Sequence, residues 1–122
     1  MSNFDKYDEI YQRQKELMDY LAQKREWYRN ANVFEKIRVT ILSIIDELME
    51  LLHELPWKPW KNLFELNREK VIEEFADLLH FVIQLQILLG ISPEVAYKYY
   101  IKKREVNFKR QKEVEGYKVD EE

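Results

Sequence analysis

The stretch ILSIIDELMELLHEL, residues Ile41–Leu55, predicts the amphipathic helix around which the rest of the chain is arranged. An α-helix turns about 100° per residue, so the isoleucines and leucines of this stretch fall on one apolar stripe. Acidic side chains follow one edge of the stripe, at Glu47, Glu50 and Glu54. The helix therefore has one face for a core and a row of carboxylates beside it.

This acidic edge has no basic partners within its own helix. No lysine or arginine occurs between Arg38 and Lys58, although exposed helix faces usually pair acids with bases three or four residues away. Asp46 and Glu50, and likewise Glu50 and Glu54, are like charges four residues apart, which destabilises a helix. A ligand outside the helix must offset this repulsion, and a divalent cation is the simplest candidate.

Composition indicates a small helical protein. The chain has 122 residues, 46% of them hydrophobic, with only two glycines and three prolines to interrupt long helices. Without cysteine it has neither disulfides nor thiolate metal sites. No apolar run is long enough to span a membrane, and no signal peptide is recognisable. We expect one cytoplasmic all-α domain over residues 1–122, with 113–122 as a mobile tail and with neither a membrane nor a nucleic-acid polymer as partner.

The expected architecture is a compact bundle of four long helices, at about residues 4–28, 33–55, 68–89 and 93–112. Asn32, Asn67 and Ser92 are suitable N-caps, and Gly90 suits the residue after the third helix. The last two turns of that helix, 83–89, are apolar nearly all round, so we expect a homodimer contact there.

A second acidic pair, Glu74 and Asp77, flanks the apolar stripe of the third helix, and Phe81 and Gln84 continue the same flank. The loop between the second and third helices is short, which favours antiparallel packing and would bring four carboxylates together. Oxygen ligands alone suit Mg²⁺, or alternatively Mn²⁺, and such ions activate water for attack on phosphorus. The predicted ligands are Glu47, Glu50, Glu74 and Asp77.

Other features fit a nucleotide. Trp57, Trp60 and Lys61 lie in a proline-stiffened loop that suits a planar, anionic ligand. Residues 98–112 are strongly basic and could neutralise phosphate charge. In the first helix Gln14 is a polar amide among apolar positions, either a boundary residue that faces water or a functional group.

Three motifs resemble the dimeric, all-α dUTP pyrophosphatases, relatives of the MazG-like nucleotide pyrophosphohydrolases. DELMELLHELPWKPWK, residues Asp46–Lys61, is similar to the acidic helix and Trp-Lys loop of that family. EEFADLLHF, Glu73–Phe81, is similar to its second acidic motif, and YIKKREVNFKRQKEVEGY, Tyr100–Tyr117, to its C-terminal motif. The resemblance implies Mg²⁺-dependent hydrolysis of dUTP, and of dUDP, to dUMP by a homodimer.

The resemblance also implies roles for individual residues. Glu47, Glu50, Glu74 and Asp77 would be the catalytic metal ligands. Trp57 or Trp60 and Phe81 would hold the uracil ring in an aromatic slot, and Gln14 would recognise its edge. The phosphate contacts would be Lys61, Tyr100, Lys103, Asn107 and Arg110.

Three alternatives remain open at this point. The acidic motifs are shared with MazG-like enzymes that act on other nucleoside triphosphates. Glu50-x-x-His53 and Asp77-x-x-His80 resemble the pairs of di-iron carboxylate bundles, although both histidines fall nearly opposite the apolar stripes. A helical interaction module without enzymatic activity is the third, and it leaves the missing counter-charges unexplained.

Overall fold

The computed structural model describes residues 5–61 and 64–121, with side chains as far as Val114. It confirms the all-α class, because the described residues contain helices and no strand. In this described part the chain forms five helices in place of the expected four. They are α1 (Lys6–Lys24), α2 (Glu26–Asn30), α3 (Val33–His53), α4 (Arg68–Leu88) and α5 (Pro93–Glu121).

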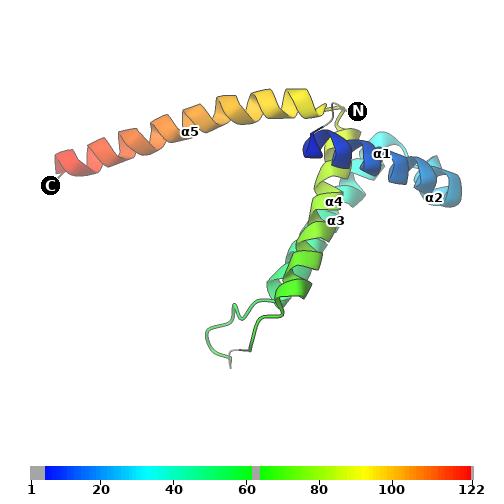
Figure 1. The fold of residues 1–122 in the computed structure, drawn as a ribbon, viewed down its shortest axis with the longest axis horizontal. Coiled ribbons are helices and arrows are strands. Elements are labelled where there is room, and N and C mark those ends of the chain that lie inside the picture. The colour runs from blue at the N-terminus through cyan, green and yellow to red at the C-terminus, as the bar shows by residue number, and fades with distance from the viewer. Residues whose placement is uncertain (1–4, 62–63, 122) are drawn as a thin grey trace. The chain divides into compact units, whose positions relative to one another are not determined.

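The chain forms two compact units, residues 1–90 and 91–122. In the first unit α3 and α4 pack side by side, α1 packs against α4, and α2 packs against α1 (Figure 1). Residues 54–67 join α3 to α4, and the two helices run antiparallel, as predicted (Figure 1). The second unit consists of α5 with the residues just before it.

The predicted caps are present. Asn32 accepts a hydrogen bond from the backbone N–H of Glu35 at 2.9 Å, and Asn67 accepts one from Lys70 at 3.2 Å. The hydroxyl of Ser92 accepts from the N–H of Val95 at 3.2 Å. Gly90 has φ 72°, the left-handed conformation that ends α4 and that other residues rarely adopt.

The predicted first helix is wrong at its C-terminal part. The chain leaves the helix at Arg25, which has φ −118° and ψ 114°, and α2 begins directly afterwards. Arg29 on α2 donates from its guanidinium to the backbone carbonyls of Ala22 and Gln23, both at 3.3 Å. These are carbonyls of the last turn of α1, which lack helical partners, so the break is stabilised by a tertiary contact with no local sequence signal.

Two other helix ends differ from expectation. The helix predicted for 33–55 ends at His53, where the chain turns into the loop. The last helix continues to Glu121, past the expected end at Lys112. The segment 113–121 contains only one glycine and no proline, so nothing in its sequence terminates a helix.

The buried residues of the first unit come from α1, α2, α3 and α4. Its buried apolar side chains are Met18, Tyr28 and Ile83, and its buried polar ones are Gln14, Thr40, Gln84 and Gln86. The end of α4 was expected to be exposed until a second copy covered it. Ile83 is only 5% exposed, and Gln84 and Gln86 are also buried within the chain, whereas Leu89 at the end of the segment is 51% exposed, so a dimer contact at 83–89 stays a prediction.

Uncovered apolar side chains lie elsewhere on the two long helices. On α3 they include Phe34, Ile41, Ile45 and Leu48, and on α4 they include Ile72, Phe75, Leu79 and Val82. Among the described residues, no single helix is long and apolar enough to cross a membrane, and α4 with the first part of α5 reaches that length only as a broken pair.

Candidate functional site

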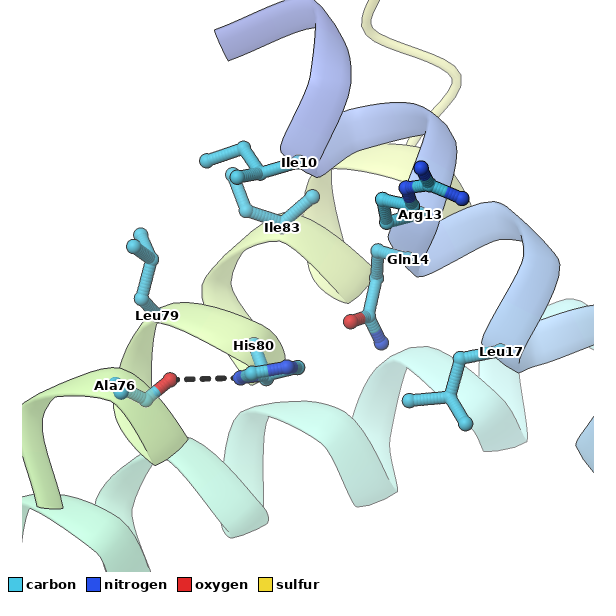
Figure 2. Close-up of a pocket in the computed structure, with 8 residues that line it drawn as sticks. All are labelled: Ile10, Arg13, Gln14, Leu17, Ala76, Leu79, His80 and Ile83. Carbon is cyan, nitrogen blue, oxygen red and sulfur yellow. Dashed lines mark hydrogen bonds between the residues drawn. The ribbon is translucent and has the colours of Figure 1, made fainter. Parts of the chain in front are cut away.

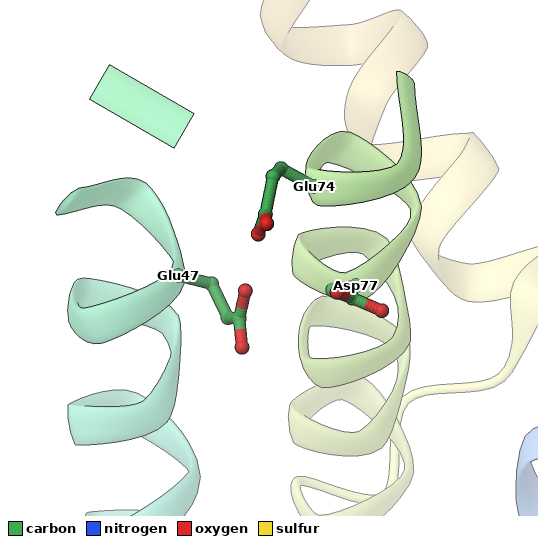
Figure 3. A group of neighbouring side chains, drawn as sticks. All are labelled: Glu47, Glu74 and Asp77. Atoms are coloured by element: carbon green, nitrogen blue, oxygen red, sulfur yellow. The ribbon is translucent and has the colours of Figure 1, made fainter. Parts of the chain in front are cut away.

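Three of the four predicted metal ligands come together between α3 and α4. Glu47 on α3 and Glu74 and Asp77 on α4 each present a carboxylate oxygen, and these oxygens all lie within 4.8 Å of one another. Glu47 and Glu74 point toward each other across the space between the two helices (Figure 3). Glu74 and Asp77 share one side of α4 because they are three residues apart. We call these three residues the acidic cluster.

The acidic cluster lacks counter-charges. Within the described part of the chain, none of its carboxylates has an ion pair or a hydrogen bond. Burial raises the pKa of Glu47 above its ordinary value of 4.5, and the charges of Asp77, Glu74, Asp46 and Glu50 raise it further. Glu47 and Glu74 are half-buried and Asp77 is exposed, so water screens part of the repulsion among the three carboxylates.

Glu50, the fourth predicted ligand, is not one of the clustered residues. It lies one turn beyond Glu47 on α3 and is exposed. Its charge still acts on Glu47. Its role as a ligand therefore stays a prediction.

The donor set of the acidic cluster consists of oxygens alone. Mg²⁺, Mn²⁺ and Ca²⁺ prefer such ligands, whereas Zn²⁺ and iron sites usually include nitrogen or sulfur. Neither His53 nor His80 belongs to the group that the described residues form, so the structure gives the di-iron alternative no support. The arrangement can hold a hard divalent cation.

A row of buried polar side chains lies farther along the same helices. The Gln84 amide donates from Nε2 to Oγ1 of Thr40 at 2.9 Å, and the Gln14 amide donates from Nε2 to Oε1 of Gln84 at 3.3 Å. Thr40 is 1% exposed and Gln14 5%, so the alternative that Gln14 is a boundary residue facing water is wrong. We call Gln14, Gln84 and Thr40 the amide relay.

Gln14 also lines a pocket of about 170 Å³ between α1 and α4 (Figure 2). The walls are mainly apolar, with polar groups from Gln14, Arg13 and His80. His80 donates from Nδ1 to the carbonyl of Ala76 at 2.8 Å, because a carbonyl can only accept. Its Nε2 is therefore the acceptor when the ring is neutral. The remaining lining residues are Ile10, Leu17, Leu79 and Ile83.

Sequence reasoning missed His80 as a pocket residue. His80 falls nearly opposite the apolar stripe of α4 that packs on α3, so this stripe alone does not place it in a pocket. However, α1 covers that opposite face of α4, so α4 has two packed faces. The apolar positions of α1 were a signal that this helix needs a surface of its own to pack on.

The aromatic loop forms a separate hollow. Trp57 and Trp60 meet edge to face with ring centroids 6.1 Å apart, and Trp57 and Lys61 line a pocket of about 190 Å³ with other loop residues. Trp60 is 72% exposed and Phe81 is half-buried. Neither lines the pocket that contains Gln14. The described residues thus do not assemble the single aromatic slot that we expected.

The predicted phosphate contacts on α5 belong to the second unit. Tyr100, Lys103 and Asn107 share one face of α5 with Arg104, Phe108 and Gln111, and this face carries a shallow hollow of about 380 Å³. Arg110 is exposed on the same helix. Their position relative to the acidic cluster remains a prediction.

Comparison with known proteins assigns the sequence to a family. A family model described as dUTPase matches residues 6–96, which is most of the chain and includes the acidic cluster, the amide relay and the aromatic loop. The match ends before Tyr100, so it does not bear on the C-terminal motif. Searches of curated proteins and of solved structures returned no match.

Proposed function

The chain belongs to the dUTPase family and is a dUTP diphosphatase-like hydrolase, and on that premise we propose that it converts dUTP to dUMP and pyrophosphate with Mg²⁺ at the acidic cluster. We also propose that dUDP is a substrate and that Mn²⁺ can replace Mg²⁺. The observation that carries the proposal is the convergence of Glu47, Glu74 and Asp77 without counter-charges.

An ion fits the acidic cluster on three grounds. Its oxygens are close enough to share one ion, none of its carboxylates forms an ion pair with a described residue, and the pKa of Glu47 is raised by burial and by charges that a cation would neutralise. Glu47, Glu74 and Asp77 would hold the ion, with Glu50 as a further ligand. Mg²⁺ bound there supplies positive charge to phosphate oxygens and lowers the pKa of a coordinated water.

The amide relay gives the proposed site a second end. Gln84 follows Asp77 on α4 by about two helical turns, and Thr40 precedes Glu47 on α3 by the same spacing. The relay therefore lies about 10 Å along the helices from the acidic cluster. This separation suits a nucleotide whose phosphates lie at the carboxylates and whose base reaches Gln14. Phe81, between the two ends on α4, would contact the base or the sugar.

Positive charge for the phosphates would come from outside the two acidic helices. Lys61 on the aromatic loop and Lys103 and Arg110 on α5 are exposed cations, and Tyr100 and Asn107 add polar groups on the same helix. We propose that these residues bind phosphate oxygens. Trp57 and Trp60 would cover the nucleotide from the loop.

We propose further that the protein acts as a homodimer. The exposed apolar residues of α3 and α4 recur at the alternating three- and four-residue spacing of helix–helix seams, as at Ile41, Ile45 and Leu48 and at Ile72, Phe75, Leu79 and Val82. We call these two rows the apolar seams. Contiguous apolar surface of this kind is rare on a monomer, and a second copy offers a matching surface.

The experiment that tests the function is a panel of all common ribo- and deoxyribonucleoside triphosphates, with dUDP, assayed for monophosphate and pyrophosphate release. We expect dUTP to be the best substrate in Mg²⁺ and no turnover in excess EDTA. Comparable kcat/KM for dCTP or dATP would contradict the dUTP assignment and would favour the alternative of a MazG-like enzyme for another nucleotide. Full turnover in EDTA would contradict the metal assignment.

A further inference from the structure

The amide relay joins three helices through side chains that are all buried. Thr40 comes from α3, Gln84 from α4 and Gln14 from α1, and each bond of the relay crosses between helices. A glutamine beside apolar side chains in a small core is costly unless both ends of its amide are satisfied. Only Gln14 among the three lines the adjacent pocket, and His80 lines the same pocket (Figure 2).

We propose that Gln84 and Thr40 are positioning residues that hold the Gln14 amide in one orientation, and that this orientation makes the enzyme distinguish uracil from cytosine. The inference rests on the proposed function, in which Gln14 meets the edge of the base. It assigns the selectivity to two residues that do not touch the base.

The chemistry of the two bases requires a fixed amide. Uracil presents an N3–H donor beside a carbonyl acceptor, whereas cytosine presents an N3 acceptor beside an N4–H donor. A glutamine amide also carries one donor group beside one acceptor, and a rotation of 180° exchanges them. An amide that rotates freely can therefore pair with either base. An amide held in one orientation can form both hydrogen bonds with only one of the two bases. Toward the other base it places donor against donor and acceptor against acceptor.

The relay holds Gln14 in the orientation that suits uracil. Gln84 Nε2 is used on Thr40, so Gln84 turns its Oε1 toward Gln14 and accepts from Nε2 of that residue. The Gln14 Oε1 is then left to accept a hydrogen bond from the N3–H of uracil. The second hydrogen on Gln14 Nε2 can donate to a uracil carbonyl. Rotation of Gln14 alone would set its oxygen against the Gln84 oxygen in a buried site, which is unfavourable, and rotation of both amides together would also require the Thr40 hydroxyl to change from acceptor to donor.

The test is the ratio of kcat/KM for dUTP to kcat/KM for dCTP, measured for the wild type, Gln84→Met and Thr40→Val. This ratio does not depend on how much of a preparation is folded, because both substrates report on the same active molecules. We expect each variant to lower the ratio roughly three- to tenfold, the size of one lost hydrogen bond. Gln84→Glu offers only acceptors to Gln14, so it should retain most of the wild-type preference.

Gln86→Met is the matched control. Gln86 is a buried glutamine on the same helix, but its Oε1 accepts from the Tyr7 hydroxyl, outside the relay. This variant should lose stability without changing the ratio. A second control is the Gln14→Ala background, in which Gln84→Met should have no further effect on the ratio, because the residue that it positions is gone.

The outcomes separate the inference from the function on which it rests. A wild type without preference for dUTP contradicts the proposed function itself. A clear wild-type preference that Gln84→Met leaves unchanged, or that Gln84→Met lowers equally in the Gln14→Ala background, overturns the positioning role alone. Where a variant turns over too slowly, the relative affinity for dUMP and dCMP in calorimetry gives the same comparison with the same expected and contradicting results.

Discussion

Glu47 on α3 and Asp77 on α4 lie with carboxylate oxygens within 4.8 Å of each other, on helices that run antiparallel. Glu74 completes the group from the next turn of α4. Three negative charges at this separation destabilise the metal-free fold, and the main contact between α3 and α4 has to overcome their repulsion. A bound cation is attracted to all three carboxylates and removes their mutual repulsion. Loss of one carboxylate should therefore weaken Mg²⁺ binding but stabilise the metal-free protein.

The first prediction concerns Glu47→Gln. The metal-free variant should unfold at the same temperature as the wild type or at a higher one, since a neutral amide removes repulsion worth a few tenths of a kcal/mol or more. The increase in Tm that Mg²⁺ gives the wild type should be lost, together with dUTP hydrolysis. Calorimetry with and without Mg²⁺ measures both effects.

Glu73→Gln is the control for this change. Glu73 is an exposed acid next to Glu74 but outside the acidic cluster, so the variant should keep its response to Mg²⁺. Glu50→Gln then decides whether the fourth predicted carboxylate is a ligand. Full activity of Glu50→Gln in Mg²⁺ would remove Glu50 from the ligand set.

The second prediction is the pH dependence of the metal-free protein. The pKa of Glu47 is raised in the folded state, so the folded protein binds this proton more tightly than the unfolded chain does. The unfolding free energy should therefore increase as the pH falls from neutral toward 4.5, the ordinary pKa of glutamate, and this part of the increase should be absent in Glu47→Gln. Mg²⁺ affinity should weaken over the same range because protons compete for the carboxylate. Denaturant titrations at several pH values test this, and identical profiles for the two proteins would contradict it.

Much of the fold and half of the site could be predicted because they depend on local signals. Asn32, Asn67 and Ser92 cap helices through their own side chains, and helical periodicity alone places Glu47 opposite Glu74 once α3 and α4 are antiparallel. The break at Arg25 was missed because the contacts that stabilise it come from Arg29, on the other side of the break.

Burial was harder to predict than periodicity. In the apolar end of α4, Ile83 and Gln84 are buried, and Gln84 forms hydrogen bonds to α1 and α3, whereas Leu89 in the same segment is 51% exposed. Gln14 stood out as a polar residue on an apolar face, yet its partner Gln84 lies 70 positions away in the sequence. No rule of local pattern connects residues so far apart, so the relay became visible only in three dimensions.

The third prediction concerns the apolar seams. If a second copy covers the seams as we propose, Ile45→Glu or Phe75→Glu should convert the proposed dimer into a monomer, because a charge buried in an apolar contact is strongly unfavourable. Tyr20→Glu is the control, since Tyr20 is exposed on α1 outside the seams. Sedimentation equilibrium measures the mass of each protein. A wild type that stays monomeric at micromolar concentration would contradict the dimer.

The fourth prediction tests how α1 is held on α4. The Tyr7 hydroxyl donates to Oε1 of Gln86 at 2.6 Å. This hydrogen bond is partly buried and joins residues that are 79 positions apart in the sequence. Tyr7→Phe should lower the unfolding free energy by about 1 kcal/mol, the usual net contribution of one such hydrogen bond. Tyr11→Phe on the same helix is the matched control and should have a smaller effect. Urea denaturation gives both values, and equal losses in the two variants would show that the Tyr7 bond adds nothing specific.

The last prediction concerns the cations of α5. Lys103 and Arg110 are exposed, so Lys103→Ala and Arg110→Ala should leave the Tm nearly unchanged. If they bind phosphate, each loss should raise the KM for dUTP roughly tenfold or more, because hydrogen bonds to charged groups contribute about 1.5–3 kcal/mol. Lys109→Ala removes a neighbouring exposed lysine for which we propose no phosphate contact. This variant controls for the general loss of positive charge. Added salt screens the long-range attraction between exposed charges, whereas it weakens a direct contact with phosphate much less. Equal KM changes in Lys103→Ala and Lys109→Ala, both abolished by added salt, would reduce the role of α5 to nonspecific attraction.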